Sequence, residues 1–185
     1  MYEVDERLLD EARARIARER RRPVLLQLRA PAGVGLSGAA AAVRLTRHAF
    51  RFGCNAFGIV GIEDAGLQRA YRERFSALYT LLYSHPAVQA ITWWDFSDHH
   101  AWMGAPSGLV RADMSPKPLY ERLLRLIWGE WATRWQGPVG EGGRITVPCA
   151  AGEHRVEVTL ASGARLSGQA RIPWQAREPV TVQLA

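Results

Sequence analysis

The residues best suited to chemistry stand together in the segment 90–102, AITWWDFSDHHAW. An apolar run there changes abruptly to Asp95, Ser97 and Asp98, followed by two histidines. This pattern is typical of a buried parallel strand whose C-terminal end opens into a polar loop. Proteins of the α/β class place their catalytic and binding groups at that end of their strands. The segment therefore predicts the functional site of the chain.

The polar side chains of this loop suggest two kinds of chemistry. Asp95 and Asp98 lie three residues apart and could form a pair of carboxylates, joined by the acidic residues 63–64 of an earlier loop. The favoured interpretation is instead that these carboxylates cap the backbone of the loop and remain solvated. A metal site on Asp98, His99 and His100 is disfavoured, because adjacent histidines on an extended segment point apart and no third ligand is well placed. We therefore predict no metal and no cofactor.

Three segments carry a resemblance to a known family. They are the ITWWDFSDHHAW run, the MSPKP run at 114–118, and the earlier RHAFRFGCNAF run at 47–57. Together they resemble glycoside hydrolase family 10, the endo-1,4-β-xylanases, whose last barrel strand carries an I-T-x-W-x-x-S-D-x-x-x-W pattern. The resemblance implies a polysaccharide or oligosaccharide of the xylan type as the partner.

The resemblance also implies a set of substrate-binding residues. Trp94 and Trp102 match the two tryptophans that form the floor and one wall of the sugar site in the family. Asp98 matches the aspartate between them. Asn55, in the segment that resembles the first barrel strand, completes the set. Sugars stack on aromatic faces through their axial C–H groups, and carboxylates orient hydroxyls by hydrogen bonds. Trp93 faces the other side of the strand and is expected in the core.

The catalytic residues of the family have no counterpart in this chain. The family uses one Glu in an Asn-Glu pair as acid/base and a second Glu as nucleophile, and a retaining mechanism needs the two about 5 to 5.5 Å apart. The single Asn of the chain, Asn55, is followed by Ala56. The resemblance covers the start of the barrel to Thr80 and its end from Leu82, so barrel strands two to seven are missing. We therefore expect no catalytic residues and no hydrolytic activity.

The periodicity of the chain predicts an α/β plus β fold, in which a partial (β/α) barrel remnant of one βαβα unit accompanies a small antiparallel sheet. Helices are expected at 5–21, 66–83 and 118–135, and strands at 24–28, 42–46, 50–57, 88–94, 144–149, 154–160, 165–172 and 180–184. As an alternative, the two N-terminal strands complete the C-terminal sheet into a sandwich. The predicted domains are an N-terminal helix (1–22), a β extension (23–49), the barrel remnant (50–136) and the C-terminal β domain (137–185), which follows a Gly-rich linker at 137–143.

Composition narrows the classes of partner. The chain has 185 residues, against about 250 for a complete barrel. Its formal net charge is +6, but the dense arginine cluster at 13–22 ends a helix that begins with acidic residues, so no nucleic acid is expected. No apolar run approaches the length of a membrane helix, so no membrane association is expected. The N-terminus lacks a secretory leader, so the sequence as given predicts a cytoplasmic protein. Proteins of the family that the chain resembles are often secreted.

Three hypotheses for function follow. The first is a xylanase-type glycosidase, which the missing carboxylates oppose. The second is a non-catalytic module that holds a polysaccharide on Trp94 and Trp102 or on the β sheet. The third is a degenerate fragment without a biochemical role, whose open strand edges would favour aggregation and also allow a homo-oligomer. The two cysteines, Cys54 and Cys149, are expected to be free and buried.

Overall fold

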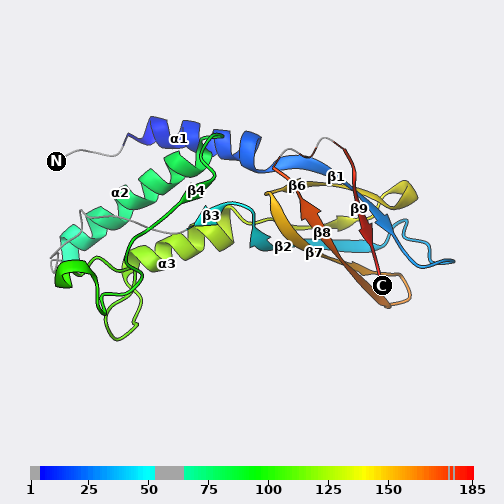
Figure 1. Ribbon diagram of the computed structural model, residues 1–185. Helices are drawn as coiled ribbons and strands as arrows, with labels where there is room; N and C mark the ends of the chain where they lie inside the picture. Colours follow the sequence, from blue (N-terminus) through cyan, green and yellow to red (C-terminus); the bar gives the residue numbers. More distant parts are fainter. Residues whose placement is uncertain (1–4, 53–64, 175, 177) are drawn as a thin grey trace. The chain divides into compact units, whose positions relative to one another are not determined.

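The computed structural model describes residues 5–52, 65–174, 176 and 178–185 (Figure 1). The chain is a mixed α/β protein that divides into two compact units. Unit 1 comprises Met1–Ile16 and Arg51–Glu130, and unit 2 comprises Ala17–Phe50 and Trp131–Ala185. Each unit is thus built from two segments that are distant in the sequence.

Unit 1 is mainly helical. Its helices are α1 (Glu6–Arg15), α2 (Ala65–Ser84) and α3 (Pro118–Leu124), and α3 continues into a π-helical turn, η4 (Arg125–Glu130). The α2 helix packs against both α1 and α3. The Asp5 carboxylate caps α1 by accepting a 3.0 Å hydrogen bond from the Arg7 N–H, which satisfies one of the free donors of the first turn. Arg15 then ties α1 to the end of α2, because its Nε donates to the Ser84 hydroxyl at 3.0 Å.

Two short strands flank α2 in the sequence. The β3 strand (Arg51–Phe52) pairs in parallel with β4 (Ala90–Ile91). This confirms the predicted parallel βαβ connection, since α2 lies between the paired strands along the chain. The predicted strand at 88–94 is much shorter than expected, because the chain leaves the ladder after Ile91 and makes the hydrogen bonds of a loop. The described strands form no closed barrel.

Unit 2 consists of two sheets. A three-stranded sheet has the order β6-β1-β9, and a four-stranded sheet has the order β5-β2-β7-β8. The bounds of the strands are β1 Arg22–Arg29, β2 Ala40–His48, β5 Arg134–Pro138, β6 Arg144–Cys149, β7 Gly152–Thr159, β8 Arg165–Ile172 and β9 Val180–Gln183. All pairings are antiparallel except that of β1 with β9. Every strand predicted for this part of the chain is present, and β6 and β8 have the predicted bounds.

The N-terminal strands complete the C-terminal sheet, as the alternative prediction had it. The β1 strand lies between β6 and β9, and β2 lies between β5 and β7. Alternating residues of both sheets, such as Leu26 and Val147 from one and Val43 and Val156 from the other, share one buried core. Two apolar faces that cover each other in this way form a sandwich.

The end of the third helix differs from the prediction. A helix was expected to reach Trp135, but the helical segment ends at Glu130 and residues 134–138 form β5. The reason is tertiary: Trp131 and Thr133 are buried in unit 2, and β5 pairs with β2 from Ala40↔Pro138 onward. The predicted linker therefore begins only after β5. No described helix is long and apolar enough to cross a membrane.

Candidate functional site

The loop between β4 and α3, residues 92–117, exposes an unusual number of large apolar side chains. Trp94 is 59% exposed, Phe96 53% and Trp102 57%, and Met103 and Met114 are also exposed. These five make up more than half of the nine exposed large apolar side chains found among the described residues. Large apolar side chains exposed together are a feature of binding surfaces, whereas single exposed ones need no explanation. We call residues 92–117 the aromatic loop.

One carboxylate holds the aromatic loop together. Asp98 Oδ1 accepts a hydrogen bond from the Gly108 N–H at 2.8 Å and an ion-paired one from Lys117 Nζ at 2.7 Å. The side chains of Asp98 and Lys117 are only 16% and 21% exposed. Lys117 Nζ also donates to the Pro106 carbonyl at 2.9 Å. The start, the middle and the end of the loop therefore meet at this ion pair.

A second polar link lies beside the first. The Ser107 hydroxyl donates to Asp95 Oδ2 at 2.6 Å, and the Ser107 carbonyl accepts from Trp93 Nε1 at 3.0 Å. Trp93 is 7% exposed and packs edge to face on Phe75 of α2, so the prediction that it belongs to the core is confirmed. The buried indole anchors the segment that carries its exposed neighbour, Trp94.

The backbone of the aromatic loop is strained. Within the part of the chain that the structure describes, all three non-glycine residues with positive φ lie here: His100 and Met103 at 58° and Met114 at 67°. Such conformations cost of order 1–3 kcal/mol each and tend to occur at functional sites. All three residues are exposed, and the side chains of Met103 and Met114 are large and apolar. The loop thus keeps a costly backbone shape together with solvent-facing apolar side chains.

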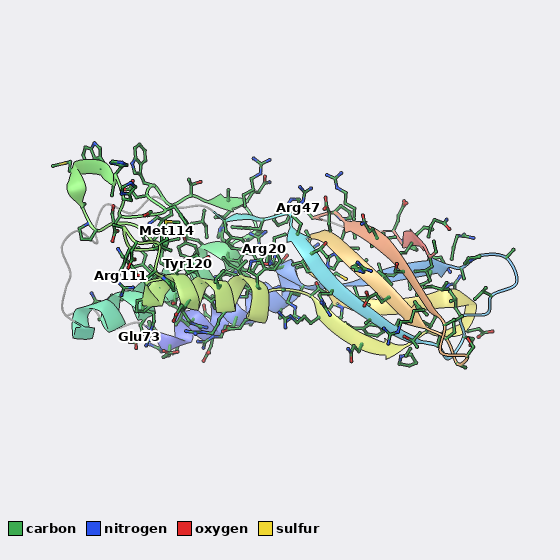
Figure 2. All side chains as sticks on the ribbon, turned by 90° about the horizontal axis from the view of Figure 1, so that it is seen from below. Arg20, Arg47, Glu73, Arg111, Met114 and Tyr120 are labelled. Carbon is green, nitrogen blue, oxygen red and sulfur yellow. The ribbon has the colours of Figure 1, made fainter. Side chains whose placement is uncertain are left out.

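The aromatic loop also contacts α3. Phe96 packs edge to face on Tyr120, with 6.1 Å between the ring centroids. Figure 2 labels Tyr120 together with Arg111 and Met114 of the loop. Arg111 Nη1 donates to the Pro116 carbonyl at 2.8 Å, and hydrogen bonds from Ser115 lower the pKa of Asp113. This end of the loop therefore has its own internal bonds in addition to the Asp98–Lys117 pair.

The structure locates most of the residues singled out in the sequence. Trp94, Asp98 and Trp102 all belong to the aromatic loop, whereas Asn55 lies outside the described residues, as do residues 63–64. Asp95 and Asp98 bind different partners, Ser107 and Lys117 respectively. Asp98 caps the loop as in the favoured interpretation, since it accepts from the Gly108 N–H, whereas Asp95 accepts from a side-chain hydroxyl. The side chain of Asp98 is less solvated than expected.

The two histidines differ from the prediction. His99 and His100 were expected to point apart on an extended segment, but their ring centroids lie 4.0 Å apart. The reason is the backbone, since the loop turns at His100 into a left-handed conformation. Among the described residues, no group of three or more His, Cys, Asp or Glu side chains is arranged to hold a metal ion.

Sequence reasoning missed the residues that shape the loop. Lys117 enters the sequence analysis only as part of the MSPKP run, although it is the single lysine of the chain, and Ser107 and Gly108 were not considered. A lone lysine among arginines could have indicated a specific ion pair, because a compact ammonium suits a narrow site better than a planar guanidinium. No local pattern indicates that Gly108 must approach Asp98.

Replacing Gly108 with alanine tests how tightly the loop is packed. A Cβ atom there would lie 2.5 Å from the carbonyl carbon of Ser97 and 2.6 Å from the backbone nitrogen of Asp98. Because both atoms belong to the backbone, they must move, and we expect a loss of about 2 kcal/mol in the free energy of unfolding. Urea denaturation followed by tryptophan fluorescence measures this. Gly129→Ala is the control, since its Cβ would meet nothing within 4 Å; equal stability of the two variants would contradict the packing.

Comparison with known proteins found no match: no protein-family model matches the chain, and no curated protein matches it.

Proposed function

We propose that this protein is a non-catalytic carbohydrate-binding protein derived from glycoside hydrolase family 10, which holds a xylan-type β-1,4-glycan on Trp94 and Trp102. The observation that carries the proposal is the exposure of these two indoles, 59% and 57%, on a loop whose backbone is fixed by internal bonds. A sugar ring presents C–H groups to an aromatic face, and stacking covers apolar area that water otherwise contacts. A rigid loop holds the rings in place before binding and so lowers its entropic cost.

The order of elements supports the derivation. A parallel βαβ unit, β3-α2-β4, is followed by a polar loop and a helix that begins at Pro118. This is the order in which the first and last segments of a (β/α) barrel would follow each other if its middle were deleted. Under this proposal, β3 and β4 are the remnants of the first and last barrel strands.

The bonds of the loop carboxylates favour binding without hydrolysis. Glycoside hydrolysis by retention needs two carboxyl groups about 5 to 5.5 Å apart with access to the anomeric carbon. Asp95 accepts from Ser107, and Asp98 forms an ion pair with Lys117 while accepting from Gly108. Under the proposal, Asp98 positions the loop, and the indoles contact the sugar.

Retention on insoluble xylan in high salt tests the proposal, because salt removes the non-specific attraction expected of a chain with a net charge of +6. We expect the intact chain to be retained, and Trp94→Ala and Trp102→Ala each to weaken retention at least about tenfold, equivalent to about 1.4 kcal/mol. Trp128→Ala is the matched control, since Trp128 is an exposed tryptophan of unit 1 outside the loop.

Two results would overturn this proposal. Release of reducing sugar from xylan by the pure chain would restore the glycosidase hypothesis. Absence of retention, combined with a broad and non-cooperative thermal transition, would favour the degenerate fragment.

A further inference from the structure

Three arginines stand side by side on the outer face of the four-stranded sheet in unit 2. The strand register places Arg44 of β2 directly opposite Arg134 of β5 on one side and opposite Arg155 of β7 on the other. All three side chains are exposed, and adjacent strands lie about 4.8 Å apart. We call these residues the arginine row.

The arginine row is unfavourable for the sheet by itself. Like charges directly opposite each other on neighbouring strands are destabilising. Glu157 relieves part of the repulsion, because its Oε1 lies 2.9 Å from Arg155 Nε. Glu157 is a single carboxylate beside the two opposed guanidinium groups of Arg44 and Arg155, so this part of the face keeps a net positive charge. Guanidinium groups bind planar carboxylates through paired hydrogen bonds, and an anionic ligand would therefore turn the repulsion into attraction.

A shallow hollow of about 650 Å³ begins beside the arginine row on the same face, a volume within the range of about 300–1,000 Å³ that is common for ligand sites. Small residues line part of it, among them Ala40 and Ala42. The polar residues Gln136, Thr159 and Ser167 line it as well, and Arg165 lies at the end opposite the row. The hollow therefore offers hydrogen-bonding groups between two positive positions.

From this arrangement we infer that the outer face of the β5-β2-β7-β8 sheet binds an acidic polysaccharide, a chain of sugars that carry carboxylate groups. The guanidinium groups would bind the carboxylates, and the neutral polar groups and Glu157 would bind the hydroxyls. This inference does not rest on the proposed function, because its residues belong to unit 2 and Trp94 and Trp102 belong to unit 1.

The same face is poorly suited to nucleic acid. Proteins that hold single strands without sequence preference stack the bases on aromatic side chains. None of the described residues lining the hollow is aromatic, and Trp135 beside the row packs against the core of the sandwich.

Binding of polygalacturonate to the full chain tests the inference. We expect saturable binding that weakens at least about tenfold in Arg44→Gln and in Arg155→Gln. Arg29→Gln is the matched control, because Arg29 is an exposed arginine on β1 in the other sheet of the same unit, and it should retain affinity within about twofold. Trp102→Ala should also bind polygalacturonate normally. A failure of the proposed xylan binding is thus distinguishable from a failure here.

Loss of folding would not explain the expected effect. Arg44→Gln removes repulsion from the centre of the row, so its melting temperature without ligand should equal or exceed that of the intact chain. Three results would overturn the inference: absence of binding to polygalacturonate, an equal loss of affinity in Arg29→Gln, or tighter binding of single-stranded DNA that is lost in Arg44→Gln. The second would indicate attraction by total charge alone, and the third a nucleic-acid surface.

Discussion

Replacing Lys117 with methionine should weaken binding of a neutral xylo-oligosaccharide at least about tenfold, as far as Asp98→Ala does. The ammonium of Lys117 bonds both Asp98 Oδ1, at 2.7 Å, and the Pro106 carbonyl, at 2.9 Å. Removing either member of a largely buried ion pair leaves the other without compensation, which costs about 2 kcal/mol. The aromatic loop would then lose the shape that presents Trp94 and Trp102.

The Lys117 variant separates two roles of Asp98. The resemblance to family 10 implies that Asp98 contacts sugar hydroxyls directly, whereas the structure shows its Oδ1 bonded to Lys117 and Gly108. If Asp98 were a direct ligand, freeing it from Lys117 would preserve or strengthen binding. If it positions the loop, Lys117→Met and Asp98→Ala lose affinity together.

The control for these variants is a surface charge change of the same size. Arg125→Met removes an exposed positive charge from the η4 segment of unit 1, and its affinity should stay within about twofold of the intact chain. Isothermal titration calorimetry gives the affinities. Unchanged binding in Lys117→Met would contradict the positioning role of the ion pair.

Stability should fall by about 3 kcal/mol as the pH is lowered from 6.5 towards 4, because of His154. This side chain is 1% exposed within unit 2, where its Nε2 lies 3.0 Å from the Thr133 hydroxyl. Burial, aided by the nearby charge of His48, lowers its pKa from 6.5 to about 4. Between these values the unfolded chain binds a proton that the folded chain does not. The stability contribution is complete above pH 6.5 and is lost as the pH falls.

Urea denaturation at pH 7.5 and at pH 5 measures this effect, with an expected difference of about 2 kcal/mol from His154 alone. His154→Gln cannot titrate in this range and should show a correspondingly smaller difference, whatever its stability at pH 7.5. His85→Gln, which alters an exposed histidine, should keep the full dependence. An identical difference in His154→Gln and the intact chain would assign the effect to other groups.

Much of the fold could be predicted from local patterns. The alternation of apolar and polar residues predicted every strand of unit 2 except β5, since these strands each bury one face. The helix at 66–83 was also recovered, because its apolar stripe is long and regular. The end of the third helix was missed, since Trp128, Trp131 and Trp135 recur at helical spacing, whereas residues 134–138 form strand β5 by pairing with β2.

The candidate site was predicted in part. The segment 90–102 identified the loop, and Trp94 and Trp102 proved to be exposed on it. The ion pair that fixes the loop was not predicted, because Asp98 and Lys117 are nineteen residues apart in the sequence and meet only through the tertiary path of the chain. The arginine row was missed for the same reason: Arg44, Arg134 and Arg155 come together only through strand register.

The most direct test of the central claim is a tryptophan fluorescence titration of the intact chain with a neutral xylo-oligosaccharide. Because Trp94 and Trp102 are more than half exposed, stacking of a sugar should change the emission. We predict a saturable change that is absent in Trp94→Ala and retained in Trp128→Ala. An unresponsive spectrum of the folded chain, or an equal response in Trp94→Ala, would contradict carbohydrate binding by the aromatic loop.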